Sequence, residues 1–185
     1  MDELSSNIIQ VSDLSSYFYE RLYHANSKSL CPVPEETIFY SSYILNKYSL
    51  SSEFFDQTSG KVKNKTLGLS ILEASKKTKE ERRRLYKDIA DTALVLTGFF
   101  GDSINRKLID RSYYIQVGQI AYSKMYAMDE HFMDIPHFYK MMATCFENLS
   151  YLINLTNPLS SHLYSGSEGE SLIQGISLNK TLKVS

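Results

Sequence analysis

The segment from Thr78 to Phe100 constrains the fold more than any other part of the chain. It opens with Thr78-Lys79-Glu80-Glu81, which fits a capping box: the threonine oxygen accepts a hydrogen bond from the backbone three residues on, and the glutamate reaches back to the cap. The second half of the segment is apolar on all sides, as in a helix enclosed by others. The sequence therefore predicts a buried central helix over about 79–100. The apolar residues that recur every three or four positions along it are Leu85, Ile89, Ala93, Leu96 and Phe100.

The rest of the chain repeats this helical spacing, and alternation of the kind that marks a β-strand is missing. A chain of 185 residues and 21.2 kDa suits one compact domain. We therefore predict an all-α, single-domain bundle of about six to eight helices over 1–158, followed by a Ser- and Gly-rich segment, 159–185, that is partly docked or flexible. The other helices are expected at 13–27, 35–48, from 51, 66–75, up to about 108, around 113–122 and 134–154.

Residue usage predicts a cytoplasmic protein without a cofactor. Cys31 and Cys145 form no C-x-x-C pair, so neither a disulfide framework nor a thiolate metal site is expected. The first residues lack the basic and apolar parts of a secretory signal, and no segment is apolar enough to span a membrane. His131, Asp134 and His137 come nearest to a metal site, but their segment is better explained as a polar loop with a helix cap, so we expect no metal.

The formal net charge of −1 conceals an uneven distribution. Residues 1–60 carry eight acids and three bases, whereas residues 61–87 carry ten bases and three acids. Such a basic block is either a solvated loop with the first turns of a helix, which compensates the acidic flanks of the same chain, or a surface that attracts an anionic partner over a distance. We expect a protein partner with an acidic surface, because a domain that binds nucleic acid is usually basic overall and this chain has a pI near 6.4. The residues expected to bind it are Lys77, Lys79, Arg82, Arg83 and Arg84, with Tyr86 as their aromatic neighbour.

Two carboxylates of the central helix, Asp88 and Asp91, are three positions apart and are placed near one face. Asp91 lies in an apolar stretch, and buried acids need partners. We expect a structural polar network that locks the central helix to its successor. An alternative is a pocket that these acids line. The candidate partners are Arg106, Arg111, Tyr113, Tyr114 and Tyr122.

No catalytic pattern stands out. Cys145 lies on the apolar face of its helix, where a thiol is usually inert, and Ser160-Ser161-His162 lacks the glycine-flanked turn of a nucleophile elbow. We therefore expect a non-enzymatic regulatory or adaptor protein that binds another protein. Two alternatives stay open: a small-ligand sensor or enzyme with a pocket between the central helix and the Tyr113 helix, and a protein that binds nucleic acid or anionic lipid.

Residues 85–122 resemble a family of uncharacterised helical proteins of proteobacteria. The family pattern is similar to GDxALFxxGFFx(D/E)SxxR(R/K)L(V/I)DxxYYxxxGxxAY, and the spacing agrees over nearly the whole stretch. Ala90 and Val95 depart from it in ways compatible with packing. The resemblance implies a bacterial, intracellular, single-domain helical protein and implies no activity. The matching residues are Asp91, Ala93-Leu94, Gly98-Phe99-Phe100, Asp102-Ser103, Arg106-Lys107-Leu108-Ile109-Asp110, Tyr113-Tyr114, Gly118 and Ala121-Tyr122.

Overall fold

The computed structural model describes residues 14–49, 67–100 and 111–157. These residues form six helices and no named β-strand, so the predicted all-α class is confirmed. The expected helices from 51 and up to 108, the basic residues at 61–65 and the segment 159–185 lie outside the described ranges. The helices are α1 (Leu14–Ser27), α2 (Glu35–Ser49), α3 (Leu67–Ala74), α4 (Lys79–Phe99), α6 (Arg111–Ala127) and α7 (Phe138–Thr156).

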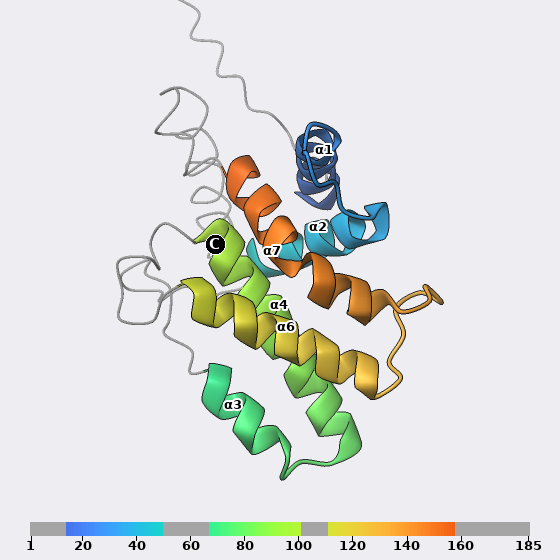
Figure 1. The fold of residues 1–185 in the computed structure, drawn as a ribbon, viewed down its shortest axis with the longest axis vertical. Coiled ribbons are helices and arrows are strands. Elements are labelled where there is room, and N and C mark those ends of the chain that lie inside the picture. Colours follow the sequence, from blue (N-terminus) through green and yellow to red (C-terminus); the bar gives the residue numbers. More distant parts are fainter. Residues whose placement is uncertain (1–13, 50–66, 101–110, 158–185) are drawn as a thin grey trace, which may run out of the picture.

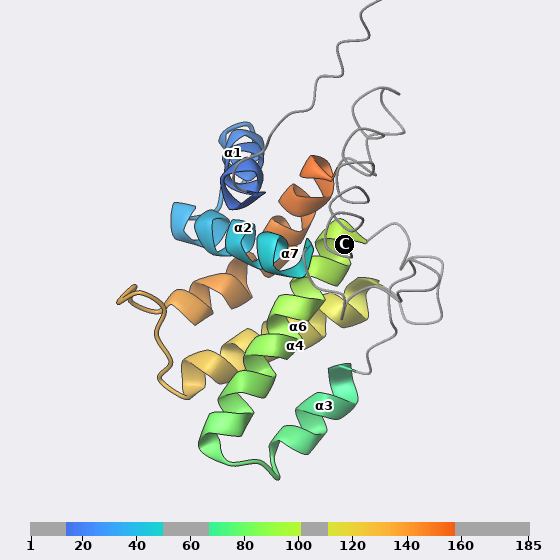
Figure 2. The same ribbon diagram turned by 180° about the vertical axis from the view of Figure 1, so that it is seen from behind.

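Helix α4 is the centre of the fold. It contacts α2, α3, α6 and α7, and Figures 1 and 2 show it running through the middle of the molecule with α6 crossing it. Every residue from Ile89 to Gly98 is buried. This burial confirms the prediction of an enclosed helix for its second half, whereas Lys79 to Glu81 at its start are exposed.

The capping box at the start of α4 is present. Glu81 N donates to Thr78 Oγ1 at 3.3 Å, and Thr78 N donates to Glu81 Oε2 at 3.0 Å. The two residues thereby satisfy backbone donors that a helix start leaves without partners. Because the same glutamate oxygen also accepts from the Thr78 hydroxyl at 3.0 Å, these hydrogen bonds lower the pKa of Glu81. The cap therefore holds the chain at a defined point between α3 and α4.

The contact between α4, α6 and α7 depends on a glycine. A Cβ atom placed on Gly118 of α6 would lie 2.2 Å from Phe146 Cζ and 3.1 Å from Ala93 Cβ. The phenyl ring of Phe146 is fully buried, so it fills the space that a side chain at 118 would need. This agrees with the expectation from sequence that the glycine admits a close neighbour.

Helix α7 begins later than its sequence predicts. A start at Asp134-Ile135-Pro136 was expected, but the helix begins at Phe138. His137, immediately before it, has φ 55°, and Asp134 has φ 56°. Because an α-helix of L-residues cannot include left-handed backbone, the proline belongs to the preceding loop. Phe132 anchors that loop, with its ring 4.7 Å from that of Tyr40 and 4.7 Å from that of Phe138.

Candidate functional site

The three consecutive arginines at the start of α4 do not share one face. Arg84 is exposed, whereas Arg82 is half-buried and its buried Nε has no hydrogen-bond partner among the described residues. Arg83 Nη1 pairs with Glu130 Oε2 in the α6–α7 loop at 3.3 Å. Successive helix residues point about 100° apart, so the three guanidinium groups diverge. Arg83 and Arg84 are therefore both exposed, and Arg83 is the one that forms an ion pair with the α6–α7 loop.

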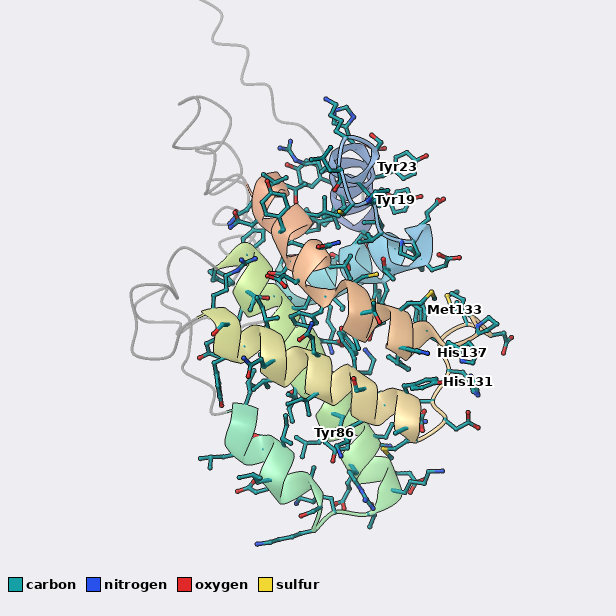
Figure 3. The ribbon with its side chains drawn as sticks, in the orientation of Figure 1. Tyr19, Tyr23, Tyr86, His131, Met133 and His137 are labelled. Atoms are coloured by element: carbon teal, nitrogen blue, oxygen red, sulfur yellow. The ribbon has the colours of Figure 1, made fainter. Side chains whose placement is uncertain are left out.

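Tyr86 is buried, with 6% of its surface exposed, so its predicted place on a partner-binding surface is wrong. Figure 3 shows it between α3 and α4. Tyr86 lies three and four positions before Ile89 and Ala90, which are also buried, and therefore belongs to the packed face of α4. Its neighbours in sequence, Arg84 and Lys87, point to other sides of the helix.

The outer face of α3 carries two exposed leucines next to the basic connection to α4. Leu69 and Leu72 are 58% and 70% exposed, although the opposite side of α3 is buried at Leu67 and Ala74. Lysines follow directly in the connection to α4, where the polar residues are exposed. We call this surface the α3–α4 corner. It consists of Leu69, Leu72, Glu73, Lys76, Lys77 and Lys79.

A buried ionic cluster lies on another side of α4. Asp91 is fully buried, and its Oδ1 accepts from the hydroxyls of Tyr40 at 3.0 Å and Tyr122 at 2.9 Å. Its Oδ2 accepts from Lys87 Nζ at 2.6 Å. Lys87 also donates to the Tyr40 hydroxyl at 2.5 Å. We call Tyr40, Lys87, Asp91 and Tyr122 the Asp91 cluster; it joins α2, α4 and α6 through one carboxylate.

The structure brings together only part of the predicted polar network. Tyr122 does donate to Asp91, but Asp88 is exposed and accepts from Tyr48 at 3.2 Å instead. Arg111 reaches neither acid: it donates to Thr97 O at 3.2 Å and Ser150 Oγ at 2.9 Å. Arg111 therefore links α4 and α6 to α7 at a separate point.

Two further tyrosines of the predicted network lie elsewhere. The hydroxyl of Tyr113 accepts from the backbone N–H of Gly68 in α3 at 3.1 Å. Tyr114 is buried and packs edge-on against Tyr113. Arg106 lies outside the described residues. The sequence argument missed Tyr40 and Lys87, of which Lys87 carries a local signal because it stands four positions before Asp91 on the same helix face.

The environment of the Asp91 cluster keeps its phenols protonated. Burial, followed by the charge of Asp91, raises the pKa of Tyr40 and of Tyr122 well above the ordinary value. The same two causes raise the pKa of nearby Tyr139 to about 12. A neutral phenol donates its proton in a hydrogen bond and does not act as a base. Asp91 is therefore the one group of the cluster that could accept a proton, and both of its oxygens already accept hydrogen bonds.

These pKa directions predict a loss of stability at high pH. A phenol whose pKa is raised by folding contributes stability below the pKa of the unfolded chain, about 10, and that contribution is lost as the pH rises. We expect the urea midpoint to fall above pH about 10, with tyrosinate absorbance and loss of helical circular dichroism rising together. In Tyr122→Phe the fall should be smaller. Titration of all phenols near pH 10 in a fully folded protein would contradict this.

Within the described ranges, no group of three or more His, Cys, Asp or Glu side chains is placed to hold a metal ion. His131 Nε2 lies 3.7 Å from Asp129 Oδ1, and Figure 3 shows His131, Met133 and His137 along the α6–α7 loop. No described helix is both long enough and apolar enough to cross a membrane. The α3–α4 corner and the Asp91 cluster therefore remain the two features on which function is argued.

The fold and these two features define an all-helical protein with a buried carboxylate whose two oxygens both accept hydrogen bonds, and with an apolar and basic surface at the α3–α4 corner. Comparison with known proteins finds no matching family model, curated protein or solved structure. The resemblance of residues 85–122 to proteobacterial helical proteins stays a prediction.

Proposed function

We propose that the protein is a cytoplasmic, non-enzymatic adaptor or regulatory protein that binds an acidic surface of another protein through the α3–α4 corner. The observation that carries the proposal is the exposure of Leu69 and Leu72 beside a group of cationic side chains. An apolar pair at positions i and i+3 on a helix, beside exposed lysines that outnumber the exposed Glu73 and Glu80, suits a partner segment that is both apolar and acidic.

The two kinds of side chain have different tasks in such a contact. Burying an exposed leucine stabilises a complex by about 1.5–3 kcal/mol, so Leu69 and Leu72 are the expected anchors. Lys76, Lys77 and Lys79 lie at the rim in water, where charges mainly raise the association rate and select the partner. The corner is thus suited to recognition of a charged, apolar segment.

The Asp91 cluster supports a structural role over a catalytic one. Each oxygen of Asp91 already accepts at least one hydrogen bond, and its tyrosine partners are neutral donors. The contact at Gly118 leaves no room for even a methyl group between α6 and Phe146. These observations favour a locked core over a pocket between α4 and α6 as the role of this region.

We expect the double variant Leu72→Glu/Lys77→Glu to lose most recovery of the native partner in a pull-down, by about tenfold or more, because it removes an anchor and reverses a charge. Helical circular dichroism should be unchanged. The matched control is Leu155→Glu/Lys124→Glu, on exposed residues of α7 and α6, which should recover the partner normally. Equal recovery of the partner by both double variants would rule out the corner as the binding surface. If the Leu72→Glu/Lys77→Glu variant kept its protein partner but lost binding to anionic vesicles, the target would be a lipid surface.

A further inference from the structure

The opposite end of the molecule carries a surface with the complementary chemistry. In α1, Tyr19 stacks on Tyr23 with ring centroids 5.9 Å apart, and the Tyr19 hydroxyl donates to Glu35 at the start of α2. One turn further along α2 lies Phe39, which is 48% exposed, and Tyr23 is 50% exposed. Glu20 and Glu36 are exposed beside them. We call this surface the α1–α2 face; it consists of Glu20, Tyr23, Glu35, Glu36 and Phe39.

The nearest cation on α1 does not neutralise this face. Arg21 lies over the ring of Tyr17, 5.7 Å from its centroid. Residues two positions apart on a helix point about 200° apart, so Arg21 and Tyr23 point to nearly opposite sides of α1. The α1–α2 face is therefore acidic and aromatic, whereas the α3–α4 corner is basic and aliphatic.

The two surfaces cannot meet within one chain. Figures 1 and 2 show α1 and α3 at opposite ends of the longest axis of the molecule, with α4, α6 and α7 between them. Complementary surfaces at opposite ends of one rigid body can only be joined by another molecule. In a contact of this kind one copy uses its corner and keeps its α1–α2 face free, while the other does the reverse, so the association is head to tail and extends into chains or rings.

We infer that a partner of the α3–α4 corner is the α1–α2 face of a second copy of the same chain. This inference rests on the proposed function, since it names the occupant of the same corner. Leu69 and Leu72 of one copy would pack against Tyr23 and Phe39 of the next, while the lysines meet Glu20, Glu35 and Glu36. A contact with so few anchors is smaller than a standard interface, so the association is weak and sensitive to salt.

Sedimentation velocity of the purified chain tests this inference. We expect the weight-average sedimentation coefficient to rise between about 10 µM and about 1 mM protein, and the rise to disappear at about 1 M salt. Lys76→Glu/Lys77→Glu should stay monomeric, and so should Glu20→Lys/Glu36→Lys. An equimolar mixture of these two variants should associate again, because each then offers the surface that the other lacks. Lys124→Glu and Glu147→Lys, on exposed residues of α6 and α7, are the controls and should behave as the wild type.

Two results would overturn the inference. One is a wild-type protein that stays monomeric over the whole concentration range; the other is a mixture of the charge-reversed variants that does not associate. Should either reversed variant lose helical circular dichroism, Leu72→Ser and Phe39→Ser replace them, and both must then stay monomeric. The pull-down tests the proposed function separately. If the wild type is monomeric but the Leu72→Glu/Lys77→Glu variant still loses its partner, the self-association is refuted and the proposed function stands.

Discussion

Replacing Asp91 by alanine is expected to lower the free energy of unfolding by about 2–5 kcal/mol, because two buried hydroxyls lose their acceptor. These are the hydroxyls of Tyr40 and Tyr122, whereas the Lys87 side chain is 35% exposed and its ammonium can turn to water. Each unsatisfied buried donor costs about 1–3 kcal/mol. Urea denaturation followed by circular dichroism would measure the change as a lower midpoint.

Asp88→Ala is the matched control, one helical turn earlier on α4. Asp88 is exposed, and the Tyr48 hydroxyl keeps its hydrogen bond with Thr92 Oγ1 at 3.1 Å, so we expect a loss below about 1 kcal/mol. A second check uses Tyr122→Phe, which should destabilise the wild type but cost much less in the Asp91→Ala background, because the hydroxyl has already lost its acceptor. Equal losses for Asp88→Ala and Asp91→Ala would refute a structural role for the cluster.

The fold was predictable because its main signals are local. The capping box at Thr78 and the apolar residues of 79–100 place α4 correctly within one residue at its C-terminal end. Both signals depend on the spacing of residues within a single helix, and that spacing can be taken directly from the sequence. The start of α7 was mistaken because a proline after an acid usually marks a first helical turn, whereas here the left-handed backbone at His137 delays the helix.

The sites were less predictable because they depend on distances between helices. Tyr40 lies 51 positions before Asp91, and no pattern within one helix could pair them. Lys87 was predictable from its four-residue spacing to Asp91, but in the sequence it also belongs to the basic block of residues 61–87. Arg82 to Arg84 were grouped because they are adjacent in sequence, although adjacent residues of a helix point in different directions.

Gly118→Ala is expected to destabilise the protein by about 2 kcal/mol, although alanine is intrinsically better than glycine in a helix by about 1 kcal/mol. The added Cβ would lie 2.2 Å from Phe146 Cζ, and the ring is enclosed on all sides. Accommodation therefore requires a shift of α6 against α4 or α7, which disturbs the packed core. Thermal unfolding and urea denaturation would both report the loss.

Gly68→Ala is a control with the same nominal overlap and the opposite expected result. Its Cβ would lie 2.2 Å from the hydroxyl of Tyr113, but that side chain is exposed and its far end can swing into water. Water then replaces its exposed hydrogen bond from Gly68 N, and the higher helix propensity of alanine offsets the loss. We expect Gly68→Ala to be neutral or slightly stabilising. Replacing the phenyl ring by a smaller side chain, in the double variant Gly118→Ala/Phe146→Leu, should recover part of the stability lost by Gly118→Ala, because the second change makes room for the methyl group. If Gly118→Ala were as stable as Gly68→Ala, close packing would not be the reason for glycine at 118.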